Sequence, residues 1–299
     1  MILLEHSNRI LADTIRQRVG QEKKEVLDIT LADFDGATYH VSTPNPDERN
    51  IILISMAWRA AADCLGMGGK EDLAKIYGPM LSAPESGYDV TLKIDLDNPI
   101  EPKDKLALKI SNLKRHVGGA PFKKMFEQIL AKNAAPDIWK VTYRENEAIY
   151  LKPEGDRCTV IFSVSFKDAD DAVYAKVFLQ EFADARRSMN NVPAVKFTYK
   201  ELPMELESYP GVEGVETNGF VSMVLFEPQM HARNVFKTIN LLQSFRNYLH
   251  YHIKCSKAYM HNRMRLQVAT WLQVLNRARP DPIAEKAKKT ATGRTFVRK

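Results

Sequence analysis

The sequence predicts an α+β protein with two similar α/β units, each built around a mainly antiparallel sheet, followed by a long helix and a basic tail. Short segments in which apolar and polar residues alternate are joined by short turns, as in β-hairpins. This pattern favours antiparallel strands with helices on one face of the sheet. The same order of helices and strands occurs twice along the chain, which indicates an internal duplication. After the second occurrence, the stretch from Asn234 to Arg279 contains neither proline nor glycine, which predicts one continuous helix.

The first predicted unit covers residues 1–117. Hydrophobic periodicity predicts its helices at 7–19, 57–77 and 104–116. Alternation of apolar and polar residues predicts its strands at 26–34, 37–42, 51–56 and 88–96. The segment Asp33-Phe34-Asp35-Gly36 fits the tight turn of the first hairpin, since the rest of an EF-hand calcium loop is absent.

The second predicted unit covers residues 118–229 and repeats this order after a boundary near Val117-Gly118-Gly119. Its helices are predicted at 121–132 and 168–187, and its strands at 139–143, 148–151, 158–166, 195–199 and 220–226. The two units also share a short sequence similarity. Ala37-Thr38-Tyr39 and Ala148-Ile149-Tyr150 lie 111 positions apart, each in the second strand of its unit. Two copies of one unit are the simplest explanation.

The long helix is predicted at 230–280, and a tail follows at 281–299. One apolar line runs along the helix with an average spacing of about 3.6 residues, which matches a straight α-helix. The second half of the helix extends beyond the length that the repeated unit needs. Its apolar line would be exposed to water in a monomer, which soluble monomers avoid. We therefore expect an obligate partner helix. The residues expected to contact it are Leu249, Ile253, Met260, Met264, Val268, Trp271 and Leu275.

Charge is distributed unevenly along the chain. There are 43 Lys and Arg residues against 37 Asp and Glu, which gives a net charge of +6. Residues 234–299 hold 14 basic residues against two acids, so they carry +12 and the preceding residues carry −6. A basic surface without function is one interpretation of this run. The other is contact with an extended acidic partner, either a protein polymer or nucleic acid.

The composition excludes several classes of protein. With 44% hydrophobic and 27% charged residues, the chain is not mainly disordered. Cys64, Cys158 and Cys255 lie far apart, which argues against a zinc ribbon or a disulfide framework and favours a reducing compartment. The N-terminus lacks the pattern of a signal peptide, and no apolar stretch approaches the roughly 20 residues of a membrane span. We expect a soluble cytoplasmic protein.

No motif predicts catalysis, and we expect neither a cofactor nor a metal. Of the histidines and the cysteine on the long helix, only His252 and Cys255 share a face, so packing is favoured over a metal site. The segment Gly66-Met67-Gly68-Gly69-Lys70 lacks the Ser or Thr and the glycine spacing of a phosphate loop. The acids of Asp168-Ala169-Asp170-Asp171 fit the start of a helix, where the helix dipole favours negative charge.

Many segments of the chain resemble one known family. On the long helix they are Thr238 to Leu241, Phe245-Arg246, Tyr248 to Tyr259, Arg263 to Arg265 and Val274 to Asp281. Upstream they are Ala32 to Gly36, Pro84 to Tyr88, Leu113 to Arg115, Val177-Phe178, Gln180 to Phe182 and Arg186-Arg187. Together they closely resemble the 34-kilodalton-class subunit family, subunit 2, of the actin-related protein 2/3 complex. The resemblance is weakest at 59–69, 121–137 and 209–218.

The resemblance implies a non-enzymatic subunit of a seven-protein assembly that nucleates a daughter actin filament on the side of a mother filament. In that family two related α/β domains precede a long helix, which pairs with the corresponding helix of subunit 4. Nucleotide and metal belong to the actin-related subunits, which are further implied partners. The implied location is the cytoplasmic actin cytoskeleton, at the cell cortex, leading edge or actin patches. The family's filament-facing region corresponds here to Arg277, Arg279, Lys286, Lys288, Lys289 and Arg294.

A nucleic-acid-binding protein is the alternative interpretation from a different class. It would use the basic helix to contact phosphates. The apolar line along the same helix and the absence of known base-stacking signatures argue against it.

Overall fold

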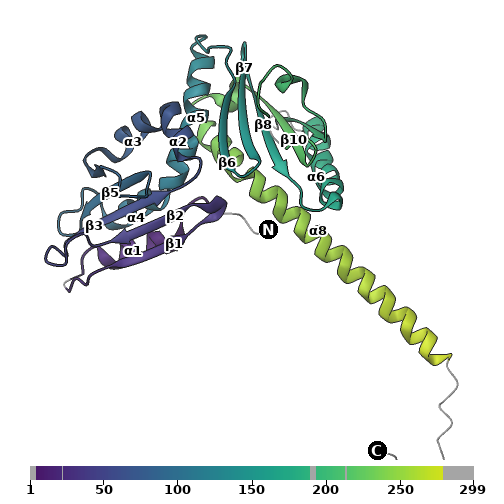
Figure 1. Ribbon diagram of the computed structural model, residues 1–299, viewed down its shortest axis with the longest axis horizontal. Helices are drawn as coiled ribbons and strands as arrows, with labels where there is room; N and C mark the ends of the chain where they lie inside the picture. The colour runs from purple at the N-terminus through teal and green to yellow at the C-terminus, as the bar shows by residue number, and fades with distance from the viewer. Residues whose placement is uncertain (1–4, 22, 189–192, 213, 279–299) are drawn as a thin grey trace, which may run out of the picture. The chain divides into compact units, whose positions relative to one another are not determined.

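The structure is a computed structural model, and it describes residues 5–21, 23–188, 193–212 and 214–278. The chain divides into two compact units, residues 1–253 and residues 254–299. The first contains both sheets and the first half of the long helix (Figure 1). The described part of the second is the rest of that helix.

Two five-stranded antiparallel sheets organise residues 1–253. The first has the order β1-β2-β3-β5-β4, with β1 (Asp28–Ala32), β2 (Thr38–Ser42), β3 (Ile51–Ala57), β4 (Leu81–Ser82) and β5 (Val90–Asp95). The second has the order β6-β7-β8-β10-β9, with β6 (Trp139–Arg144), β7 (Glu147–Glu154), β8 (Arg157–Ser165), β9 (Ala194–Tyr199) and β10 (Asn218–Phe226). The two orders are the same when strands are counted within each sheet. This match confirms the predicted α+β class and the duplication.

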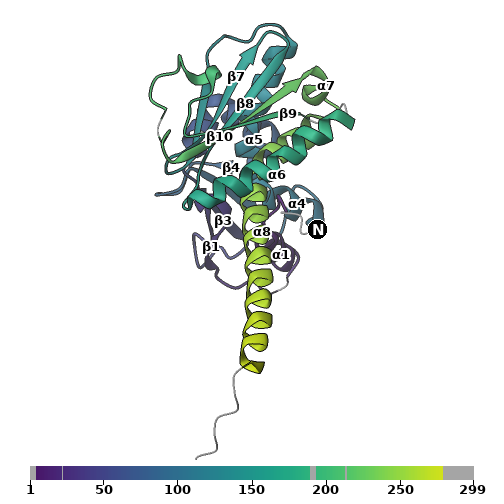
Figure 2. The same cartoon turned by 90° about the vertical axis from the view of Figure 1, so that its right-hand side faces the viewer.

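Eight α-helices are described along the chain. They are α1 (Arg9–Arg18), α2 (Ala61–Cys64), α3 (Lys70–Tyr77), α4 (Lys103–Ser111), α5 (Leu113–Leu130), α6 (Ala169–Ser188), α7 (Glu227–Met230) and α8 (Val235–Arg277). The first begins where the side chain of Asn8 accepts a hydrogen bond from the Leu11 amide at 2.9 Å, which satisfies a free donor of the first turn. Helix α6 packs against β9, as Figure 2 shows from the side.

One hydrophobic core joins the inner faces of both sheets. Leu242 and Phe245 of α8 are 0% and 1% exposed in this core, and the ring of Phe245 lies 4.9 Å from that of Phe162 in β8. The first half of α8 is therefore part of the core that the duplicated units share. A smaller cluster around Tyr150 and Phe220 covers the other face of the second sheet.

The repeated letters are not structurally equivalent, although the repeated order is. Tyr39 belongs to the main core on the inner face of the first sheet. Tyr150 belongs to the small cluster on the outer face of the second sheet. Side chains alternate between the two faces of a sheet along each strand. The two tyrosines therefore do not occupy equivalent positions when the two units are aligned strand by strand, since their positions differ by an odd number of residues. The similarity between these two tripeptides is therefore coincidental, although the duplication of the strand order is real.

The glycines that suggested a boundary lie inside a helix. Helix α5 runs without interruption through Gly118 and Gly119, where the sequence predicts a break. A Cβ atom on Gly119 would lie only 3.0 Å from the Gln243 amide nitrogen and 3.1 Å from a methyl of Ile239, both on α8. These residues lack side chains because two helices cross there at close range. The division of the chain at residue 117 stays a prediction.

The glycine-rich segment after α2 is also a helical feature. Leu65–Gly69 forms a π turn between α2 and α3, with Gly68 at φ 101°. A Cβ on Gly69 would lie 2.7 Å from the carbonyl oxygen of Cys64, so no side chain fits there. The strand β4 was not predicted, because two residues are too few to show alternation.

We predict a pH dependence of stability from His116 in α5. Burial, with the charges of Arg115 and Lys109, lowers the pKa of His116 from 6.5 to about 4. The unfolded chain then takes up a proton at higher pH than the folded chain. The free energy of unfolding should fall as pH falls from 6.5 to about 4, by up to about 1.4 kcal/mol per pH unit. Urea denaturation at several pH values measures this slope. His116→Gln should lose this component, whereas replacing the exposed His261 by Gln should keep it.

Candidate interaction site on the long helix

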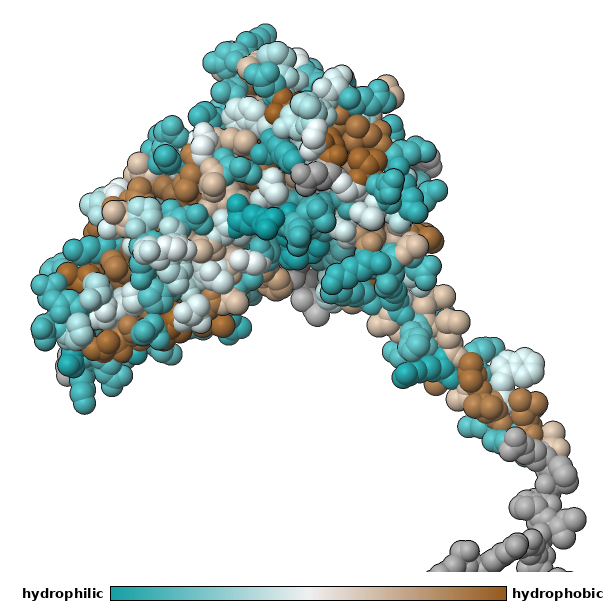
Figure 3. Space-filling model, viewed as in Figure 1, coloured by the Kyte–Doolittle hydropathy of each residue, from teal (hydrophilic) through white to brown (hydrophobic). Residues whose placement is uncertain are grey.

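The environment of α8 changes at Ile253. Up to this residue, one side of the helix is buried in the chain's own core, at Thr238, Ile239, Leu242, Phe245, Leu249 and Ile253. Beyond it, large apolar side chains at the same helical spacing are between 46% and 64% exposed, at Met260, Met264, Val268, Trp271 and Leu275. Figure 3 shows hydrophobic side chains gathered on this part of the helix. One apolar line is thus covered in its first half and uncovered in its second.

The predicted partner-helix residues fall on both sides of this change. Leu249 is 0% exposed and Ile253 is 1% exposed, so the chain's own residues already cover them. A partner helix can therefore reach only the five later positions. Sequence periodicity cannot separate the two groups, because spacing shows which residues share a face but not what covers that face.

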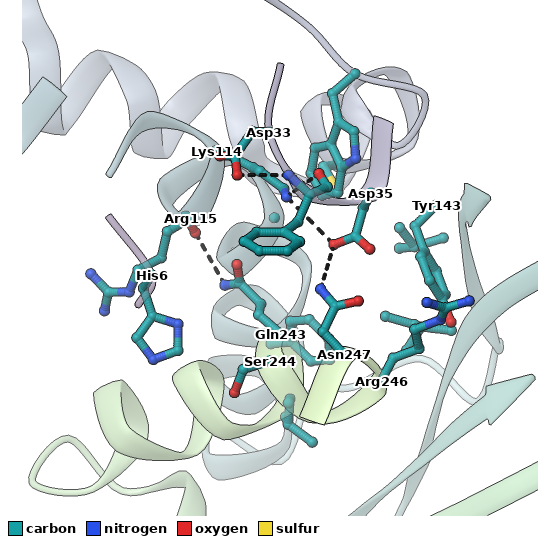
Figure 4. A pocket seen from close by; sticks show the side chains of 18 of the residues that line it. His6, Asp33, Asp35, Lys114, Arg115, Tyr143, Gln243, Ser244, Arg246 and Asn247 are labelled. Carbon is teal, nitrogen blue, oxygen red and sulfur yellow. Dashed lines mark hydrogen bonds and ion pairs between the residues drawn. The ribbon is translucent and has the colours of Figure 1, made fainter. Parts of the chain in front are cut away.

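Two consecutive residues of α8 bind the first hairpin of each sheet. Both oxygens of Glu147, at the start of β7, accept hydrogen bonds of 2.8 Å from the guanidinium of Arg246. The side chain of Glu147 is only 3% exposed, and it also accepts a bond from the Ser165 amide at 3.0 Å. The amide of Asn247 donates to Asp35 at 3.2 Å, in the turn between β1 and β2. Figure 4 shows Arg246, Asn247 and Asp35 around one small cavity.

Asp35 is the centre of this junction. Its side chain is 11% exposed, and it receives the guanidinium of Arg144 at 2.8 Å and the ammonium of Lys114 at 3.4 Å. Burial alone would raise the pKa of Asp35, but the charges of Lys114 and Arg144 and the hydrogen bonds lower it below 3.8. The carboxylate is therefore ionised at neutral pH, and it ties the first hairpin to α5, β6 and α8.

The sequence predicts the turn at Asp35 but not the contacts of its side chain. Its backbone has φ 61°, which fits a turn tip. Its partners Lys114, Arg144 and Asn247 are 79 to 212 positions away, so no local spacing connects them. The available signal was that Ala32 to Gly36 and Leu113 to Arg115 both belong to the segments that resemble a known family.

The junction offers no activated nucleophile. Cys64 lines the cavity, and burial raises the pKa of its thiol to about 12, so it stays protonated at neutral pH. On α8, His252 stacks on Phe178 at 4.4 Å, and burial lowers its pKa. Across the residues that the structure describes, no three His, Cys, Asp or Glu side chains gather as a metal-ligand set. None of the described helices is long and apolar enough to span a membrane.

The residues predicted to face a filament are only partly described. Arg277 is the last residue of α8 and is exposed. Arg279, Lys286, Lys288, Lys289 and Arg294 lie outside the described residues. Of the described cations beyond Ile253, those at Lys254, Arg263, Arg265 and Arg277 belong to exposed residues.

A duplicated α+β body joined to a helix with an uncovered apolar face is typical of a subunit of a larger assembly. Comparison with known proteins specifies the assembly. Residues 54–282 match the family described as Arp2/3 complex, 34 kD subunit p34-Arc. A protein of Dictyostelium discoideum named actin-related protein 2/3 complex subunit 2 is 45% identical, over 99% of this chain and 99% of its own. The protein of the same name from Schizosaccharomyces pombe is 40% identical over the full length of both chains. This chain belongs to the p34-Arc family.

We predict that Arg246→Ala strongly destabilises the chain. The substitution removes both 2.8 Å hydrogen bonds to the buried Glu147 carboxylate and leaves it only the longer contact to Arg144 at 4.0 Å, which costs up to about 3–5 kcal/mol. Arg157→Ala is the matched control, because it removes an Arg–Glu pair in which Arg157 is 48% exposed and should cost no more than about 1 kcal/mol. Chemical denaturation of both variants measures the difference. Equal losses would contradict the structural role assigned to the buried pair.

Proposed function

We propose that this chain is a non-catalytic structural subunit of the Arp2/3 complex, in which α8 pairs with the long helix of subunit 4 and its basic end binds the mother actin filament. The family of the chain supports the assembly. The observation that carries the pairing is the exposed apolar line from Met260 to Leu275 on a helix anchored in its own core up to Ile253. Through these contacts the chain supports nucleation of branched filaments.

The exposed line suits a helix as its partner. Met260, Met264, Val268, Trp271 and Leu275 recur every three or four residues, so they form one stripe along α8. The stripe is about 22 Å long at 1.5 Å per residue, which matches four turns of a facing helix. Burying five large apolar side chains provides the core of a stable interface.

The basic character of the helix suits an acidic surface. No acid occurs from Pro228 to Pro280, and Arg246 is already neutralised by Glu147. The exposed cations beyond Ile253 therefore have no acid on their own helix to neutralise them. A filament with an acidic side would attract them over a distance set by the salt concentration.

The further partners and the location follow from the family. Other subunits, including the actin-related proteins, would contact the body of the chain, and nucleotide and metal would be bound by the actin-related proteins. The subunit names imply the cytoplasmic actin cytoskeleton. Its cell cortex, leading edge or actin patches are the proposed sites within it.

Binding to nucleic acid is the second candidate, and the cations of α8 are what favour it. A titration of the complex against actin filaments and against duplex nucleic acid, each at two salt concentrations, separates the two candidates. Saturable filament binding with weaker, non-saturating duplex binding supports the first proposal. The reverse order would favour nucleic acid.

We predict that Trp271→Ala weakens the complex but not the isolated chain. Trp271 is 62% exposed in the chain, so its loss there removes few contacts. Buried against a partner helix, the same substitution leaves a cavity that costs about 3–5 kcal/mol. Yield and melting temperature of the co-expressed complex measure the effect. Leu266→Ala is the control, because Leu266 is 69% exposed and lies outside the stripe. An unaltered complex with Trp271→Ala would contradict the pairing.

We predict that replacing Arg277 and Arg279 together by Glu lowers filament co-sedimentation and branch formation without affecting assembly. The change reverses charge where the helix would face an acidic filament, so the loss should be greatest at low salt. The matched control reverses two exposed cations of the first unit, Arg9 and Lys105, which are 81% and 72% exposed. Unchanged branching with the first pair, in an intact complex, would count against the filament contact.

A further inference from the structure

A row of polar side chains crosses the whole first sheet. Thr30 lies opposite His40, His40 opposite Ser55, and Ser55 opposite Thr91, which in turn pairs with Ser82 on the edge strand. Residues directly opposite each other in neighbouring antiparallel strands point to the same face. Ser55 is 0% exposed and Thr91 is 1% exposed, although they lie on the face opposite to their core neighbours Ile54 and Leu92. Something polar therefore covers the middle of this row.

The cover is the loop 83–89, which connects β4 to β5. The amide of Glu85 donates to the Thr91 hydroxyl at 2.9 Å, and that hydroxyl lies 2.9 Å from the Ser55 hydroxyl. The Glu85 carboxylate lies 3.0 and 3.1 Å from Nδ1 of His40. The ring of Tyr88 stacks on the His40 ring at 5.5 Å. His40 thus contacts the loop through two of its side chains.

Both ring nitrogens of His40 face carboxylates. Nδ1 faces Glu85, and Nε2 lies 3.0 Å from Asp28 in β1. An ionised carboxylate only accepts hydrogen bonds, and a neutral imidazole has one N–H to donate. Both contacts can be hydrogen bonds only when the ring is doubly protonated. This argument rests on geometry alone.

The electrostatic surroundings agree with this geometry. Burial acts to lower the pKa of His40, but the hydrogen bonds and charges of Glu85 and Asp28 raise it above 6.5. Burial acts to raise the pKa of Glu85, but the bonds from Ser55 and His40 lower it. The groups that face His40 are therefore Asp28 from β1, Glu85 and Tyr88 from the loop, and uncharged side chains from the neighbouring strands β1 and β3.

We propose that His40 is a pH-sensitive clamp that holds the loop 83–89 on the outer face of the first sheet when protonated and releases it when neutral. A neutral ring gives up one of its two carboxylate hydrogen bonds and the charge that attracts the other. The clamp is fully formed below pH 6.5, the pKa of His40 in the unfolded chain. It is lost as pH rises through the higher pKa of His40 in the folded chain. It is independent of what α8 binds.

Hydrogen exchange of the full chain in its assembled complex tests the clamp. Exchange would be followed by mass spectrometry at about pH 6 and about pH 8.5, with rates corrected for the intrinsic pH dependence of amide exchange. Protection of the loop peptide should fall about threefold to tenfold at the higher pH, the range expected for one partly exposed charge-assisted hydrogen bond. Unchanged protection would overturn the proposal.

Variants separate the clamp from general loosening of the sheet. His40→Gln should give low protection of the loop at both pH values. His116→Gln is the matched control and should keep the response, because the pKa of about 4 places His116 outside this pH window. If His40→Gln fails to fold, Glu85→Gln provides the test, because it removes the loop carboxylate that faces His40 and should likewise give low protection at both pH values. A wild-type response in either His40→Gln or Glu85→Gln would overturn the proposal.

Discussion

The Arg246–Glu147 ion pair lies between α8 and the second sheet, where the Glu147 side chain is 3% exposed and water cannot replace its partner. Asn247, the next residue of α8, binds Asp35 in the first hairpin. One turn of helix thus fixes both copies of the duplicated unit. The core around Leu242 and Phe245 forms at the same junction, so polar and apolar contacts specify the same position for the helix.

Because of this anchoring, the two halves of α8 have different surroundings. Its first half belongs to the hydrophobic core that joins two sheets of identical strand order. Its second half continues the same apolar spacing after the core ends at Ile253. The glycines of α5 let the helices approach closely, so the anchored half is held by backbone contact as well as by side chains.

Periodicity was enough to predict the α+β class, the two units and nearly all of α8, because hydrophobic spacing reports directly on strands and helices. It failed at Gly118 and Gly119, where glycine signals a close crossing as readily as a turn. It also could not place Asp35, whose partners come from three distant elements. On α8 it found the apolar line but not the change at Ile253, since coverage depends on tertiary structure. Long-range contacts of this kind have no local signature.

The uncovered line from Met260 to Leu275 has a consequence for the life of the chain in a cell. A newly made copy without its partner would present a hydrophobic helix face that invites aggregation and engagement by chaperones. In the proposed pairing only assembly covers that face, so copies made in excess would be degraded. The abundance of the chain should therefore follow the supply of the protein that covers the helix, whatever the rate of its own synthesis.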